Sequence, residues 1–384
     1  MTQVINTNVA SINAQRNLNT SQSSLNTSLT RLSSGLRINS ARDDAAGLAI
    51  SERFTAQIRG LDVASRNAND GISLSQTAEG ALGEVTNNLQ RIRELAVQSA
   101  NATNSTTDRA ALQTEAGQLL SEVDRVANQT QFNGVNLIDG SFTSAVFQVG
   151  ANAGETITVS SLVDANTAAL GSVTAANGQS SAVAGITALG AVGAGALVIN
   201  GTDVGASIGA AGTSQQRVGQ VVDAINNFAT TTGVNAAFDS STGRILLSSA
   251  ADIAVTGTDD GTATGFNVGG GDGTATAATT TGLTGLDLSS FAGASLAIQQ
   301  IDSALGQVNS ARATLGAIQN RFSSVVSNIA STSENLSASR SRIQDADFAK
   351  ETANLTRGQI LQQAGTAILS QANSAPQSVL SLLR

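Results

Sequence analysis

Hydrophobic side chains recur at helical spacing over long stretches near both ends of the chain. Toward the C-terminal end they return every seven residues, and Ile298, Leu305 and Val326 occupy the partner position of the repeat. A sustained heptad of this kind is typical of a coiled-coil seam. The pattern therefore predicts a long helix over residues 298–343 that packs into a rod through Ile301, Val308, Leu315, Phe322, Ile329, Leu336 and Ile343.

Amphipathic stripes that step by three and four residues predict further helices in the first 130 residues and in the last forty. The two terminal helices are far apart in sequence. In a monomer, the free energy gained by burying their apolar faces is smaller than the conformational-entropy cost of ordering the two helices. We therefore expect them to pair and to gain stability from neighbouring copies. The alternative is that each end packs only on its own domain. The expected assembly surface comprises Leu18, Leu25, Leu29, Leu32, Leu36, Leu361, Ile368, Val379 and Leu382.

The periodicity changes after residue 130. Asn133-Gly134 lies between short apolar runs and predicts a β-hairpin, and further strands are expected at residues 142–149 and 156–159. Farther along, residues 216–228 have the pattern of an amphipathic helix, and 236–248 that of a second hairpin. The fold class is therefore mainly α with β: elongated, with paired terminal coiled-coil helices, a helical rod with hairpins, and a central α+β module.

The amino-acid composition excludes most familiar kinds of catalytic and metal-binding site. The 384 residues contain no Cys, His, Trp or Tyr, so zinc, iron–sulfur, thiol and Ser-His-Asp sites are excluded. The formal net charge is −8 without a basic cluster, which argues against nucleic acid as a partner. No apolar stretch reaches 18 residues and no ordinary signal peptide is visible, so we expect no membrane insertion. The chain then either stays in the cytoplasm or leaves by a route that reads no such signal.

Two acidic segments are the nearest candidates for a chemical site. Residues 259–261 and 269–273 combine aspartate with glycine, but their spacing fits no calcium loop, so we expect no metal and no cofactor. Asp43, Asp44 and Glu52 are paired carboxylates without a sign of a pocket, and a structural role near arginines is the better interpretation. We therefore expect no catalytic residue and no enzyme activity.

Five stretches in order make the chain resemble a bacterial flagellin, the subunit of the flagellar filament. They are residues 1–8 (MTQVINTN), 31–48 (RLSSGLRINSARDDAAGL), 65–71 (SRNANDG), 89–101 (LQRIRELAVQSAN) and 379–384 (VLSLLR). The resemblance covers roughly residues 1–160 and 290–384. A hook–filament junction protein of the flagellum remains an alternative, because it shares the terminal-helix design. A coiled-coil secretion or adhesion protein would explain the heptads but not residues 31–48.

The resemblance implies a domain arrangement and a set of partners. Residues 1–43 with 344–384 would form the inner tube of the filament, 44–165 with 290–343 the rod domain, and 166–289 a variable surface-exposed insertion. The chain would polymerise with itself into an open helix for swimming motility. It would be exported through the flagellar type III apparatus, with a flagellin-specific export chaperone on its C-terminal helix, and would meet filament cap and junction proteins. Its location would be secreted, in the extracellular filament.

Residue-level expectations from the resemblance concern host flagellin sensors. Arg91, Leu95 and Glu115 match the rod surface that Toll-like receptor 5 recognises. Residues 30–51 resemble the peptide read by a plant flagellin receptor, with Asp43, Asp44 and Gly47 at the informative positions. The same residues also have a structural interpretation as parts of subunit packing.

Overall fold

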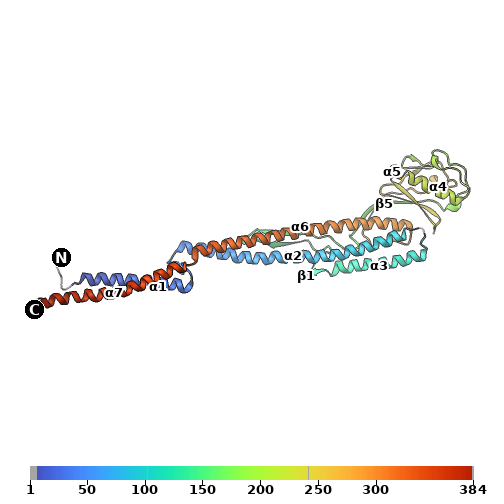
Figure 1. Cartoon of the computed structure of the whole chain (residues 1–384). Coiled ribbons are helices and arrows are strands. Elements are labelled where there is room, and N and C mark those ends of the chain that lie inside the picture. Colours follow the sequence, from blue (N-terminus) through green and yellow to red (C-terminus); the bar gives the residue numbers. More distant parts are fainter. Residues whose placement is uncertain (1–6, 102, 241, 383–384) are drawn as a thin grey trace. The chain divides into compact units, whose positions relative to one another are not determined.

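A computed structural model describes residues 7–101, 103–240 and 242–382, with side chains up to residue 374. The chain divides into two compact units. Unit 1 comprises Met1–Asn69, Gln148–Ile157 and Ser324–Arg384, and unit 2 comprises Asp70–Phe147 and Thr158–Ser323. Each unit therefore combines segments from distant parts of the sequence, as the colours of Figure 1 show.

Unit 1 contains the two terminal helices, α1 (Val9–Ser34) and α7 (Phe348–Leu382), side by side and antiparallel (Figure 1). The side chain of Asn8 caps α1 by accepting a hydrogen bond from the backbone N–H of Ser11, and α1 ends at Gly35, whose φ of 72° closes the helix in the left-handed conformation. The predicted pairing of the chain ends is confirmed.

The position of Leu36 differs from the expectation. The sequence pattern places Leu36 on the same helix as the other leucines of the stripe, but it follows Gly35, after the end of α1, and forms an isolated bridge with Asp345. The next backbone N–H, of Arg37, donates to the carbonyl of Gln344 at 2.7 Å. Leu36 is therefore part of the connection that follows α1, because glycine reverses the chain before the helical period reaches it.

Two long helices, α2 (Ala45–Ser99) and α6 (Phe291–Gln344), contribute to both units, and α3 (Thr106–Gln129) belongs to unit 2. A capping box between Ser105 and Asp108 starts α3. The second amphipathic stripe is buried in α2, where Leu82, Val85 and Leu89 have no exposed surface. The helical periods predicted from the sequence thus mark the buried faces.

Short hairpins follow α3. The first joins β1 (Gln131–Phe132) to β2 (Val135–Asn136) through Asn133 and Gly134, as predicted. The second pairs β3 (Ser144–Gln148) with β4 (Thr156–Ser160).

The central segment of unit 2 is an α+β module, as predicted. Its antiparallel four-stranded sheet has the order β11-β5-β9-β8, and a three-stranded sheet has the order β10-β6-β7. Helix α4 (Ser214–Asn227) packs on β8 and buries Val221 and Ile225. The strands are β5 (Ser172–Gln179), β6 (Val198–Ile199), β7 (Thr202–Asp203), β8 (Val234–Asp239), β9 (Arg244–Ser249), β10 (Val255–Thr256) and β11 (Ala278–Thr281). The short helices are η1 (Val183–Gly185), η2 (Gly205–Ser207), α5 (Ala229–Thr232) and η3 (Val268–Gly270).

A fully buried arginine connects two loops of this module. Arg217 on α4 has no exposed surface, and its guanidinium donates to the carbonyl oxygens of Gly209, at 2.9 Å, and Gly190. Burial lowers the pKa of Arg217, and the charge of Asp259 opposes that effect. The arginine therefore holds both loops against the helix by charge-assisted hydrogen bonds.

We predict that Arg217→Met loosens these loops. The substitution keeps most of the side-chain volume but leaves two carbonyls without their donor, at a cost of about 1–3 kcal/mol for each group that stays buried. Limited proteolysis should then cut near Gly190 or Gly209 first, while the helices of unit 2 resist as before. Arg244→Met is the control, because Arg244 is only half-buried and its bond to Ser180 is 3.4 Å long. Equal protease resistance of both variants would contradict the prediction.

Candidate functional site

Glycines on α7 allow the terminal helices to approach each other closely. A Cβ added at Gly358 would lie 3.0 Å from a methyl carbon of Leu25, and one at Gly365 would lie 3.1 Å from a methyl carbon of Leu18. The two leucines of α1 therefore sit over glycines spaced seven residues apart on α7. The leucines were expected at this surface from the sequence, but Gly358 was not; its seven-residue spacing from Gly365 was the available signal.

A buried polar cluster joins the same two helices about two turns before Gly358 on α7. Glu351 is 6% exposed, accepts a hydrogen bond from the Ser28 hydroxyl at 2.9 Å, and pairs with the Arg31 guanidinium at 3.1 Å. Burial alone raises the pKa of Glu351, but hydrogen bonds from Ser28, Arg31 and Asn354 outweigh it, so the pKa is lowered overall. Charge and hydrogen bonding thus fix the register of α1 against α7. This cluster was not predicted from the sequence, because nothing in the local pattern links residues so far apart.

The outward faces of α1 and α7 carry many apolar side chains. Leu29 is 48% exposed and Ile368 is 60% exposed, whereas Leu18, Leu25 and Leu32 are half-buried. Val379 and Leu382, also expected on this surface, lie outside the residues whose side chains are described. Large apolar side chains exposed in such number are typical of interaction surfaces. The exposed ones are Val9, Ile12, Leu29, Phe348, Ile360, Leu361 and Ile368.

The segment that resembles the plant-receptor peptide forms a tight turn ahead of α2. Asp43 accepts hydrogen bonds from the backbone N–H groups of Asn39 and Ser40, which lower its pKa. Asp44 accepts from the backbone N–H of Gly47 at 2.8 Å and so caps α2. The carboxylates therefore hold the turn. The hydrogen bonds of Asp43 come from Asn39 and Ser40.

Gly47 is buried, and the space beside it is already filled. A Cβ there would lie 2.5 Å from Oδ2 of Asp44 and 2.7 Å from Cδ1 of Ile38. We predict that Gly47→Ala lowers the stability of this turn by about 1–3 kcal/mol, as overpacking usually does. The matched control is Gly83→Ala in the same helix, where a Cβ meets nothing within 4 Å. Hydrogen exchange of residues 38–47 should accelerate only in Gly47→Ala; protection equal to that of the control would refute the prediction.

The heptad residues of α6 are on its buried side, as the seven-residue repeat predicts. Ile301, Val308, Leu315 and Phe322 of unit 2 have no exposed surface. In unit 1, Ile329 is 7% exposed and packs with Leu61 and Ala64 of α2, with Leu336 partly buried beside them. Ile343 is half-buried.

Two of the three expected receptor residues lie together on the surface of unit 2. The Arg91 guanidinium pairs with Glu115 at 2.8 Å and with Glu94 at 2.9 Å, and both hydrogen bonds raise the pKa of Arg91. Leu95 is different, because it is only 1% exposed and is among the largest fully buried side chains. The expectation that Leu95 lies on the surface is therefore corrected: its side chain is part of the buried core.

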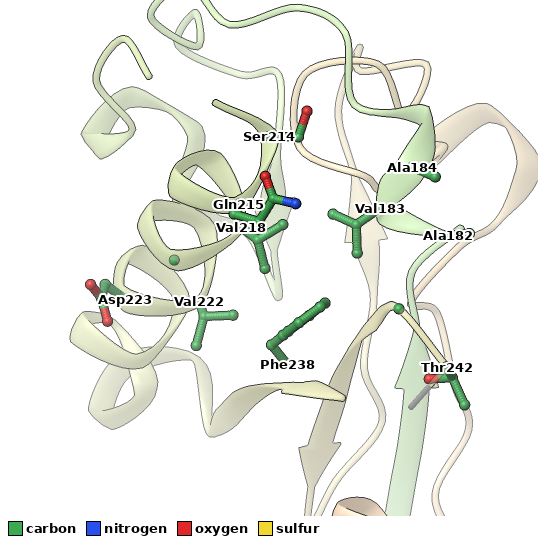
Figure 2. A pocket seen from close by; sticks show the side chains of 12 residues that line it. Ala182, Val183, Ala184, Ser214, Gln215, Val218, Val222, Asp223, Phe238 and Thr242 are labelled. Atoms are coloured by element: carbon green, nitrogen blue, oxygen red, sulfur yellow. The ribbon is translucent and has the colours of Figure 1, made fainter. Parts of the chain in front are cut away.

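An apolar cleft of about 650 Å³ lies in the central module between α4, η1 and the β8–β9 turn. Figure 2 shows Val218 and Val222 of α4 on one side, Val183 opposite them, and the ring of Phe238 between. Phe238 is 40% exposed although its strand partner, Ile245, is fully buried. Asp223, the charged residue of the lining, directs its carboxylate away from the cleft in this view. The cleft thus suits an uncharged apolar group.

The acidic segments considered as calcium loops use their carboxylates within the fold. Asp259 accepts from the backbone N–H of Thr264 at 2.7 Å, Asp260 from the backbone N–H of Thr262 at 3.1 Å, and Asp272 from the backbone N–H of Ser181 at 2.9 Å. Over the described residues, no three acidic side chains gather in a way that could hold a metal ion.

None of the helices, as far as they are described, is both long and apolar enough to span a membrane.

Comparison with known proteins points to one family. Residues 5–143 match the model of the bacterial flagellin N-terminal helical region, and residues 298–383 match that of the C-terminal helical region. B-type flagellin of Pseudomonas aeruginosa is 41% identical, and flagellin A of Vibrio anguillarum is 43% identical, each with both chains covered completely. Among solved structures, FliC from Burkholderia pseudomallei is 29% identical and covers 66% of this chain and 100% of its own, with a TM-score of 0.40.

These matches define a structural subunit of the bacterial flagellum, built around helical regions at both ends of the chain. The chain belongs to the bacterial flagellin family. It is a subunit of the filament of the flagellum, the motility organelle to which its relatives also belong. The junction-protein alternative has less support than the filament subunit.

Proposed function

We propose that the chain enters the filament through the outward apolar surface of the α1–α7 pair. The exposure of Ile368, at 60%, carries this proposal, because a monomer gains nothing from presenting so large an apolar side chain to water. Contacts between different surfaces of successive copies do not close on themselves and generate an open helical polymer. The subunit would have no catalytic activity.

Seeded polymerisation tests this proposal. The full chain should form long filaments by sedimentation and negative-stain electron microscopy, and a variant lacking residues 345–384 should form none. Ile368→Ser should also fail to polymerise while keeping its helix content, because the Ile368 side chain is exposed on α7 and does not fill the space between the paired helices. Gln363→Ser is its control, since Gln363 is an exposed polar residue on the same helix. Short rings from the full chain would favour the junction protein, and filaments from Ile368→Ser would contradict the proposed surface.

We also propose that a flagellin-specific export chaperone covers α7 before assembly. The apolar residues Leu361 and Ile368 would otherwise bind other copies in the cytoplasm. The chain would then pass through the flagellar type III apparatus and join filament cap and junction proteins outside the cell. Residues 1–43 with 344–384 would line the filament, residues 44–165 with 290–343 would form the rod domain, and residues 166–289 would face the surroundings.

Recognition by Toll-like receptor 5 is proposed for the exposed Arg91–Glu115 pair. Arg91→Ala should reduce receptor signalling, because it removes a cation from the surface without opening the core. Arg125→Ala is a matched control: Arg125 is equally exposed and pairs with Glu122 on α3. Unchanged signalling by Arg91→Ala, or equal losses by both variants, would count against the proposed contact. For the plant receptor, the turn formed by Asp43, Asp44 and Gly47 is the proposed contact.

A further inference from the structure

The turn between β1 and β2 leaves an asparagine side chain in contact with water. Asn133 and Gly134 form this two-residue turn with positive φ angles of 49° and 79°. Asn133 is exposed, and a Cβ at Gly134 would meet nothing within 4 Å. Among the described residues, no side-chain hydrogen bond holds the Asn133 amide. An asparagine followed by glycine thus sits here with both reacting groups accessible.

The chain contains two further Asn-Gly pairs, and the fold restrains both. The Asn200 amide donates to the carbonyl of Thr232 at 2.8 Å, and its oxygen accepts from the backbone N–H of Ala254 at 2.8 Å. Asn177 lies within β5, and the Gly178 that follows is buried. A Cβ at Gly178 would lie 2.0 Å from the carbonyl oxygen of Gly273, so its backbone has no room to turn. The same dipeptide therefore occurs in one open and two closed environments.

We infer that Asn133 is a site of spontaneous deamidation, whereas Asn177 and Asn200 are protected. Base removes the proton of the Gly134 peptide nitrogen, which attacks Cγ of Asn133. The new N–Cγ bond closes a five-membered succinimide, and the side-chain nitrogen leaves as ammonia after taking up a proton. Water then opens either carbonyl of the ring, giving aspartate or isoaspartate. The overall change converts an amide and water into a carboxylate and ammonium, with no redox step and no enzyme.

Glycine at the second position matters because a side chain there would crowd the attacking nitrogen. In the strand, ring closure at Asn177 requires local opening of the β5–β9 pairing first. At Asn200 the amide must leave both hydrogen bonds before its carbon can be attacked. Each requirement lowers the population of reactive conformers.

Deamidation would change the hairpin in two ways. It adds a negative charge beside Val135, a residue that is 52% exposed. The isoaspartate product also lengthens the backbone by one carbon, so the two-residue turn can no longer keep the β1–β2 register. The modified chain would therefore differ at a defined point on the surface of unit 2.

Timed incubation of the purified full chain in mildly alkaline buffer tests the inference. Trypsin with a glutamyl endopeptidase separates residues 126–155, which contain Asn133, from residues 156–217, which contain Asn177 and Asn200. Mass spectrometry with fragmentation that identifies isoaspartate should show conversion at Asn133 at least about ten times faster than at the other two, since they react only from locally opened states. In guanidinium chloride the three rates should become similar.

Two outcomes would overturn the inference: retention of the Asn133 amide as complete as at Asn177 and Asn200, or equal conversion at all three in the folded chain. The denatured sample requires no substitution, so the comparison does not depend on how a variant folds. As a further check, Asn133→Gln should show no conversion at position 133 on the same timescale, because its longer side chain would form a less favourable six-membered ring.

Discussion

Replacing Phe322 with alanine should destabilise unit 2 by about 3–5 kcal/mol, the cost of a large cavity in a closely packed core. Phe322 on α6 is fully buried, and its ring meets that of Phe147 edge-on with centroids 5.5 Å apart. Chemical denaturation of the monomer, followed by circular dichroism, measures the loss.

A substitution at Gly71, which packs against Phe322, tests the same contact independently. A Cβ at Gly71 would lie 2.5 Å from Cζ of Phe322, so Gly71→Ala alone should cost about 1–3 kcal/mol. In the Phe322→Ala background the same substitution should stabilise by about 0.5–1 kcal/mol, because the cavity accepts the methyl group and alanine favours the helix. Gly80→Ala, with nothing within 4 Å of its Cβ, should stabilise in both backgrounds. If Gly71→Ala changes the free energy of unfolding in the same direction in both backgrounds, the Gly71 and Phe322 positions do not compete for one space.

Glu351→Gln should weaken the α1–α7 pair by about 1–3 kcal/mol, less than the loss of a fully buried ion pair because the Arg31 side chain is 29% exposed. The variant keeps a partner for Ser28 but loses the charge opposite Arg31. Because the folded pKa of Glu351 is lowered, its contribution is present above the unfolded value and is lost as pH falls through the folded one. The unmodified pair should therefore weaken below about pH 4.5, the ordinary value for glutamate.

Hydrogen exchange of α1 and α7 across this pH range provides the measurement. Glu122→Gln is the matched control, since Glu122 also pairs with an arginine but on the exposed surface of α3. The control should leave the exchange of α1 and α7 unchanged, whereas Glu351→Gln should accelerate it near neutral pH and flatten its acid dependence. An unchanged acid dependence in Glu351→Gln would show that other carboxylates control the pairing.

The helices and the first hairpin were predictable because their signals are local. The heptad on α6 predicts which face is buried without any knowledge of the segment that packs on it. Asn133-Gly134 is the residue pair that favours a two-residue turn with positive φ angles. The α4 helix and the β8–β9 hairpin were also predicted, within a few residues of their limits.

Strand β5 was missed because its sequence carries little strand preference. Ser172–Gln179 contains alanine, asparagine and glycine, and it is a strand because β9 and β11 pair with it. The Ser28–Arg31–Glu351 cluster was missed for a related reason: Glu351 is more than 300 positions from the other two residues, so only the folded chain brings them together. Neither feature has a local sequence signal strong enough to predict it.

The two members of the α1–α7 pair are far apart in the coding order, and this imposes a condition on synthesis. The leucines over Gly358 and Gly365 are translated more than 300 residues before the glycines that receive them. A prematurely terminated product therefore has α1 but nothing for it to dock on. The pairing thereby reports that synthesis has passed α7, because only a chain translated through α7 can form it.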